Sequence, residues 1–273
     1  MGGRGSKSGM VRAGTVYPGT RFPNMMVQPP TQQPTIPPQP NPAVANQAPS
    51  PQNTPVLQGG VDTLSKMSDD QLAAIYNASR NVDMPNHLSD VDDKTQKFVY
   101  AAGLNEKPVV LDNASFKQYM SDNNISQGEV LARSVGSANY TVNGTRITLS
   151  PHQVTAMIKD SDLTYVGGKH GGMLHGAGTY FDQNGGRPTG YSNGATAIAV
   201  LSKTRARVIQ EHTLMNRVSS WSKSHPKFAR AVGPVRTSNM SIYALAMGYN
   251  TIQFGSYHNV IDRTALVMRS NDY

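Results

Sequence analysis

The spacing of apolar residues predicts a helical part of the chain from about residue 61 to residue 128. Ser68-Asp69-Asp70-Gln71 has the spacing of a capping box, and Leu72, Ile75 and Tyr76 follow at helical intervals. A helix is therefore expected from about Asp69 to Asn81. Ser89 is the expected start of a second helix that runs through Phe98, with Gly103 beyond its end.

A short apolar run and a third helix complete this helical part. The run is Val109-Val110-Leu111, and the amphipathic segment after Asp112 carries Phe116 and Tyr119 on one face. We interpret residues 61–128 as a small helical layer.

The pattern changes to strands at Glu129. Leu131-Ala132-Arg133-Ser134-Val135 is apolar apart from its arginine and serine, and a buried arginine requires a partner. A hairpin is expected around Asn143-Gly144, because this dipeptide adopts the positive φ angles of a tight turn. Ser150-Pro151 then predicts the start of a helix.

The first 60 residues lack such periodicity and have a different composition. They contain 12 of the 18 prolines and the four cations Arg4, Lys7, Arg12 and Arg21, but no acidic residue. Such a segment cannot bury enough apolar surface to offset the entropy of ordering it. We predict that residues 1–60 are a disordered, basic, proline-rich tail.

Charge and cysteine content exclude several classes of protein. The net charge of +8 divides into +4 for the tail, −4 for residues 61–128 and +8 for residues 129–273. The absence of cysteine excludes disulfides and cysteine-ligated zinc. No apolar run reaches the roughly 20 residues of a membrane-spanning helix, and the amino terminus lacks the apolar core of a secretory signal.

The segment from Gly167 to Phe181 contains six glycines in fifteen residues. Glycine lets backbone approach a ligand closely, although a flexible loop has the same composition. The segment matches neither a Rossmann fingerprint nor a Walker loop. His170 and His175 lie five residues apart without a nearby acid, so no metal site is expected.

Together with its surroundings, this segment resembles the phage-type, arginine-type branch of the ADP-ribosyltransferase superfamily. The resemblance covers roughly residues 129–270 and rests on the order of short motifs. The motifs are Leu131-Ala132-Arg133-Ser134-Val135, Gly176-Ala177-Gly178-Thr179-Tyr180-Phe181, Ala206-Arg207-Val208-Ile209, Ala244-Leu245-Ala246-Met247-Gly248-Tyr249-Asn250-Thr251-Ile252 and Val260-Ile261-Asp262-Arg263-Thr264-Ala265-Leu266-Val267.

The resemblance implies an α+β domain over residues 129–273, with a split, mostly antiparallel sheet and a cleft for NAD. Arg133 would hold the NAD phosphates, since a guanidinium suits a pyrophosphate. Gly176 and Gly178 would line the cleft, and Tyr180, Phe181 and Tyr191 would surround the nicotinamide. The alternatives are a core salt bridge for Arg133 and plain core packing for the aromatic residues.

The chain departs from the family at the catalytic acid. Active members carry a glutamate near the last strands, whereas Gly255-Ser256-Tyr257-His258-Asn259 occupies that region here and no glutamate follows Glu211. By elimination, Glu211 and Asp262 are the candidate catalytic acids. The alternative for Glu211 is a solvated residue that starts a helix near Leu214. The alternative for Asp262 is a structural residue that pairs with neighbours of Arg263 or caps a bulge.

Two functions are compatible with these features. The first is a phage-encoded, NAD-dependent mono-ADP-ribosyltransferase that modifies a host protein or nucleic acid. The second is an inactive virion component that binds capsid or DNA through its tail and through the eight cations between Lys203 and Arg236. We expect the protein in the host cytoplasm, in the virion, or in both.

Overall fold

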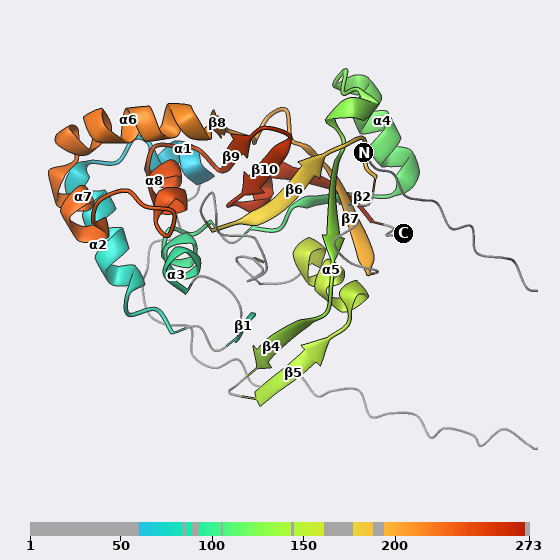
Figure 1. Ribbon diagram of the computed structural model, residues 1–273, viewed down its shortest axis with the longest axis horizontal. Helices are drawn as coiled ribbons and strands as arrows, with labels where there is room; N and C mark the ends of the chain where they lie inside the picture. Colours follow the sequence, from blue (N-terminus) through green and yellow to red (C-terminus); the bar gives the residue numbers. More distant parts are fainter. Residues whose placement is uncertain are drawn as a thin grey trace, which may run out of the picture. The chain divides into compact units, whose positions relative to one another are not determined.

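In the computed structural model, strands with alternating apolar residues form a curled, mostly antiparallel eight-stranded sheet (Figure 1). Helices and a separate three-stranded sheet complete the fold. The structure describes residues 60–83, 86–88, 93–104, 106–142, 145–160, 177–187 and 194–270. All of these belong to one unit, Pro51–Tyr273. Residues 1–59 of the predicted tail (residues 1–60) lie outside the described residues, and Gly60 begins a helix.

The chain is thus a mixed α+β protein. Its helices are α1 (Gly60–Leu64), α2 (Asp69–Ser79), α3 (Asp93–Ala101), α4 (Asn113–Asp122), α5 (Pro151–Asp160), α6 (Glu211–Ser224), α7 (Pro226–Val232) and α8 (Met240–Ala246), with 3₁₀ turns η1 (Gln127–Glu129) and η2 (Arg263–Ala265). Its strands are β1 (Asn86–Leu88), β2 (Val109–Leu111), β3 (Leu131–Val135), β4 (Ala138–Val142), β5 (Thr145–Leu149), β6 (Thr179–Gln183), β7 (Ala195–Leu201), β8 (Val208–Gln210), β9 (Thr251–Phe254), β10 (Tyr257–Val260) and β11 (Leu266–Arg269).

The large sheet has the order β2-β11-β7-β3-β6-β10-β9-β8. Its inner pairs are antiparallel, while the pairs β2–β11 and β8–β9 at its two ends are parallel. The short run at residues 109–111, which precedes the strand-rich part of the sequence, therefore joins the sheet as an edge strand. The small sheet has the order β1-β4-β5 and is antiparallel.

Capping side chains fix the starts of the predicted helices. Ser68 Oγ accepts from the Gln71 amide at 3.3 Å, and Gln71 Oε1 accepts from the Ser68 amide, so the predicted capping box of α2 is confirmed. Asp112 caps α4 by accepting from the Ser115 amide at 2.7 Å. The second helix, expected from Ser89, is observed from Asp93, and residues 89–92 lie outside the described part of the chain.

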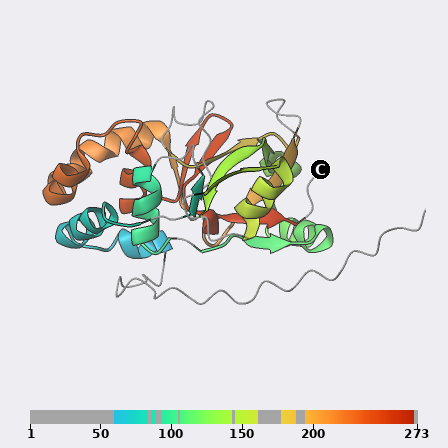
Figure 2. The ribbon, with the colours of Figure 1, turned by 90° about the horizontal axis from the view of Figure 1, so that it is seen from below.

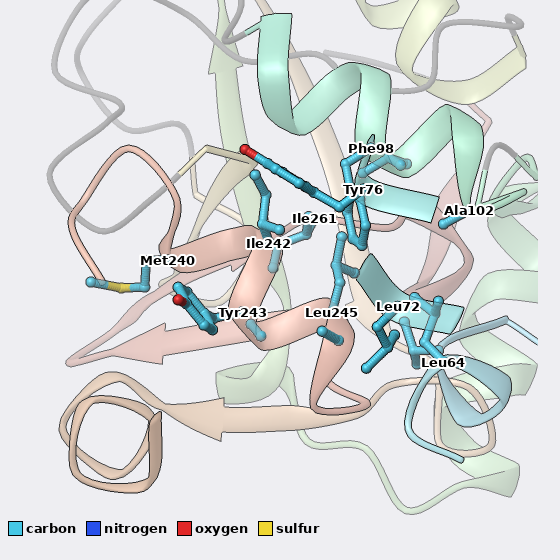
Figure 3. Close-up of a cluster of buried hydrophobic side chains, with 14 of the residues drawn as sticks. Leu64, Leu72, Tyr76, Phe98, Ala102, Met240, Ile242, Tyr243, Leu245 and Ile261 are labelled. Carbon is cyan, nitrogen blue, oxygen red and sulfur yellow. The ribbon is translucent and has the colours of Figure 1, made fainter. Parts of the chain in front are cut away.

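The largest core forms where helices from both ends of the sequence meet. Every residue of α8 is buried, and α1, α2 and α3 surround this helix together with α6 and α7. Figure 3 shows Leu64, Leu72 and Phe98 from three helices directed toward Ile242 and Leu245 of α8. Figure 2 shows α2 and α7 at one end of the unit and α4 and α5 toward the other.

Two smaller cores attach helices to the large sheet. One packs α5 on the face that carries Leu131 and Phe181, and the other packs α4 on the face that carries Ala132 and Ile198. The strand register places Ile209 and Ile252, which belong to the core around α8, on the same face of the sheet as Ala132. One sheet face is therefore covered by α4 at one end and by the α6–α8 region at the other.

Candidate functional site

The sheet opens between β3 and β6. These strands pair only at Leu131–Gln183 and Ala132–Asp182, whereas β3 stays paired with β7 along all five of its residues. Arg133 is the first residue of β3 beyond the paired part, and its Nη1 donates to the Tyr180 carbonyl at 2.9 Å. The guanidinium thus bridges the opening and brings together two residues that the sequence assigns to one site.

Arg133 and Tyr180 meet through the tyrosine backbone. Alternation along β3 puts Arg133 on the face of Leu131 and Val135, which α5 covers, whereas the ring of Tyr180 belongs to the opposite face. Both side chains are partly exposed. The site therefore consists of a cation at the opening and an aromatic side chain on the far face of the sheet.

Three aromatic side chains form a shelf on that far face, between the areas covered by α4 and by the α6–α8 region. The rings of Tyr180 and Phe254 meet edge to face with centroids 5.7 Å apart, and those of Phe254 and Tyr257 are stacked at 5.5 Å. Tyr257 is 37% exposed. A partly exposed aromatic shelf can stack against a flat ring such as a nicotinamide or a nucleobase.

The glycine at position 178 is explained by packing within the protein. A Cβ on Gly178 would lie 1.6 Å from Oδ1 of Asn259, which is fully buried on β10. The neighbouring Ala177 carbonyl accepts from Ser241 Oγ of α8 and, at 3.4 Å, from Asn259 Nδ2. Gly178 thus lets the start of β6 lie close to β10 and α8.

Phe181 lies in the core and not in the opening. Its side chain is 1% exposed, under α5, and it faces His258 across the β6–β10 pair. Its burial agrees with the alternative of plain core packing and not with a place beside the nicotinamide. His258 is itself buried, and its Nδ1 has no hydrogen-bond partner among the described residues. Burial lowers the pKa of His258, although the charge of Asp182 acts in the opposite direction.

Asp182 is a carboxylate that the sequence reasoning missed. It is the only acidic residue in the strands that the structure describes, and it is partly exposed. It lies two residues from Tyr180 on the same face and pairs directly with Tyr257. The alternation Tyr180-x-Asp182 was the available signal, once Tyr180 had been placed on a strand.

Glu211 lies at the far edge of the sheet. It begins α6 directly after β8, as its structural alternative proposed. In the strand order β6-β10-β9-β8, three inter-strand spacings separate β8 from β6, or about 14 Å. The structure therefore does not bring Glu211 next to Tyr180.

Asp262 is buried two residues beyond the end of β10. Its carboxylate accepts from the Thr264 amide at 3.0 Å and from Thr264 Oγ at 2.8 Å, so Asp262 caps the 3₁₀ turn η2. Its role is structural, although it caps a turn and not the expected bulge. Burial raises the pKa of Asp262. It borders a cavity of about 300 Å³ that Arg205, Arg207 and Glu106 also line, and Tyr180 does not line this cavity.

Several residues of the predicted site lie outside the described residues. They are Gly176 and Tyr191, together with His170 and His175 of the glycine-rich segment. Within the described ranges, no group of three or more histidine, aspartate or glutamate side chains is arranged to hold a metal ion.

A basic surface lies apart from the opening, where α2, α3 and α7 meet. Two adjoining grooves of about 580 and 340 Å³ share Arg80 and Ala231. Arg80 is held in place because its Nη2 donates to the Ala231 carbonyl at 2.8 Å and its guanidinium lies over the Tyr76 ring. The cations that line the grooves are Arg80, Lys94, Lys97, Lys227 and Arg230.

In comparisons with known proteins, no family model, curated sequence or solved structure matches the chain. No helix in the described ranges is long and apolar enough to cross a membrane. What is established is therefore the class, a mixed α+β protein with a curled, mostly antiparallel sheet, and the geometry of its sites.

Proposed function

We propose that the chain is a phage-encoded, NAD-dependent mono-ADP-ribosyltransferase that transfers ADP-ribose to a host protein or nucleic acid. The proposal combines the ordered motifs between Arg133 and Val267 with the opening between β3 and β6. It implies that the protein acts in the host cytoplasm, and an active enzyme can also be carried in the virion.

The observation that carries the proposal is the hydrogen bond from Arg133 Nη1 to the Tyr180 carbonyl. It joins the first and second motifs of the resemblance at the point where the sheet opens. A guanidinium has five donors in a fixed plane, a geometry that suits the oxygens of a pyrophosphate.

The residues at the opening fit the chemical groups of NAD. The Arg133 guanidinium, which reaches the opening from the α5-covered face, would supply positive charge for the two phosphates. The Tyr180–Phe254–Tyr257 shelf on the opposite face would supply aromatic surface for a ring, so NAD would bind across the opening. Transfer requires loss of nicotinamide through a state with positive charge on the ribose, so a site that orients both ends of NAD favours the reaction.

The test is incubation of the full chain with NAD labelled in its adenylate part and with host lysate. We expect label on a macromolecule, nicotinamide release, and a thermal shift on addition of NAD. Tyr180→Ala should reduce all three, and Tyr100→Ala, an exposed tyrosine on α3, is the matched control. Absence of label, nicotinamide release and thermal shift with the unaltered chain would refute the proposal.

The basic grooves favour a second candidate, an inactive virion component that binds DNA or capsid. Five cations line the grooves, and the one acid among the lining residues, Asp70, is engaged by Lys227. This arrangement suits a phosphate backbone. Stoichiometric copies in purified particles, salt-dependent DNA binding and inertness toward NAD would together favour this candidate.

A further inference from the structure

The aromatic shelf and the carboxylate of Asp182 share one strip of the sheet. Tyr180 and Asp182 lie two residues apart on β6, which is about 7 Å along an extended strand. Asp182 is also directly opposite Tyr257, whose ring stacks on Phe254. A ring on the shelf would therefore place its substituents within reach of a carboxylate.

The surroundings of Asp182 leave its carboxylate accessible. Asp182 is partly exposed, and its Oδ2 accepts a hydrogen bond from Asn184 Nδ2 at 3.4 Å, within the turn that follows β6. By contrast, Asp262 is 1% exposed with both carboxylate oxygens engaged by Thr264, and Glu211 lies three strands away. Of these three acids, Asp182 alone lies beside the shelf.

We propose that Asp182 is the catalytic carboxylate of this site, facing the ribose of NAD whose nicotinamide rests on the shelf. The inference rests on the proposed function and identifies the group that assists its chemical step. Asp182 thus takes the place of Glu211 and Asp262 as the candidate catalytic residue, because the sheet register sets it beside the shelf.

The step that Asp182 assists balances with NAD and a nucleophile alone. The bond between ribose C1′ and the nicotinamide nitrogen breaks, and its electron pair leaves with neutral nicotinamide. Positive charge develops on the ribose, and the carboxylate of Asp182 stabilises that charge. Water or an acceptor group then forms the new bond to C1′, and its proton passes to Asp182 and on to solvent.

The test compares Asp182→Asn, Asp182→Glu and Glu211→Gln in the full chain, with Asp122→Asn on α4 as the matched control. Nicotinamide release gives kcat and titration calorimetry gives the Kd for NAD. We expect Asp182→Asn to lower kcat about 100-fold or more while Kd changes less than about threefold, since the amide keeps the shape and loses the charge. Asp182→Glu should retain part of the activity, and Asp122→Asn all of it.

The outcomes separate the failure of this inference from the failure of the proposed function. If the unaltered chain binds NAD but Asp182→Asn retains full kcat, or if Glu211→Gln abolishes cleavage instead, the assignment of Asp182 is overturned and NAD binding stands. If the unaltered chain binds NAD without cleaving it, the assignment of Asp182 and the proposed transferase activity both fail. If the unaltered chain does not bind NAD, the proposed function itself fails.

Discussion

Single residues at the start of β6 decide how closely it approaches its neighbours. Gly178 leaves the space that the Asn259 side chain fills, and the Ala177 carbonyl beside it accepts hydrogen bonds from β10 and α8. A side chain at position 178 would collide with Asn259 and, at 3.0 Å, with the Val260 carbonyl.

Gly178→Ala should therefore destabilise the protein by about 2 kcal/mol through overpacking. Removing the opposing side chain in the double variant Gly178→Ala/Asn259→Ala should recover part of this loss. Denaturant unfolding of both single variants and the double variant gives the coupling energy between the two positions. Additive losses would show that Asn259 is not what excludes a side chain at position 178.

His258 makes stability depend on pH near neutrality. Burial lowers its pKa in the folded state below the usual value of about 6.5, so the unfolded chain binds the proton more readily. The contribution of neutral His258 to the free energy of unfolding is therefore complete above the pKa of the unfolded chain. This contribution is lost as the pH falls below that pKa.

We expect the free energy of unfolding to fall between about pH 7.5 and 5.5, and to fall less in His258→Gln. Urea unfolding of both proteins at the two pH values measures the difference. The raised pKa of Asp262 acts in the opposite direction and is common to both proteins, so it cancels in the comparison. An equal fall in both proteins would contradict the role of His258.

At the scale of elements, one side chain of α2 fixes the start of α7. Asp69 Oδ2 accepts from the Lys227 amide at 2.9 Å, and its Oδ1 accepts from the Phe228 amide at 2.8 Å. These amides are the unpaired donors of the first turn of α7. The adjacent Asp70 instead forms an exposed ion pair with Lys227 Nζ.

Asp69→Ala should thus cost about 1 kcal/mol of stability, as the loss of a helix cap does, while Asp70→Ala should cost less than about 0.5 kcal/mol. Both residues lie in the first turn of α2, so their contributions to that helix match. Thermal unfolding of the two variants checks the difference. Equal losses of stability in the two variants would mean that the hydrogen bonds from Asp69 to α7 add nothing to what an acidic residue contributes in the first turn of α2.

Helices, whose starts depend on local sequence, could be predicted, whereas the order and register of the strands could not. Capping and periodicity placed α2 and α4, and Ser150 starts α5 with the expected serine cap, its Oγ accepting from the Gln153 amide. Sheet order depends on contacts between distant segments, so nothing near Glu211 indicated that β8 lies at the edge. Alternation along the strand indicates that Asp182 shares a face with Tyr180, but its position opposite Tyr257 exists only in the register of β6 and β10.

Net charge by segment was also a poor guide to surface charge. Residues 61–128 sum to −4, yet Arg80, Lys94 and Lys97 from this segment line the basic grooves. Asp62, Asp69 and Asp70 are meanwhile engaged by Arg207 or by residues of α7. Folding thus sorts charges by spatial neighbours, which a sum along the chain does not capture.

At the scale of the whole molecule, the opening between β3 and β6 and the basic grooves are separate surfaces. At the first, the Arg133 guanidinium meets the backbone carbonyl of Tyr180, whose ring lies on the far face of the sheet. The second is lined by cations from three helices. An enzyme that modifies a polyanion would use both surfaces, whereas a virion component would need only the second. Binding of NAD therefore distinguishes the two functions.

The most direct test is calorimetric titration of NAD into the full chain and into Arg133→Lys, which keeps a donor for the Tyr180 carbonyl but loses the planar guanidinium. We predict saturable binding to the unaltered chain and a Kd raised about tenfold or more in the variant, with little change in melting temperature. Absence of binding to the unaltered chain, or equal affinity in both proteins, would contradict the assignment of the opening as an NAD site.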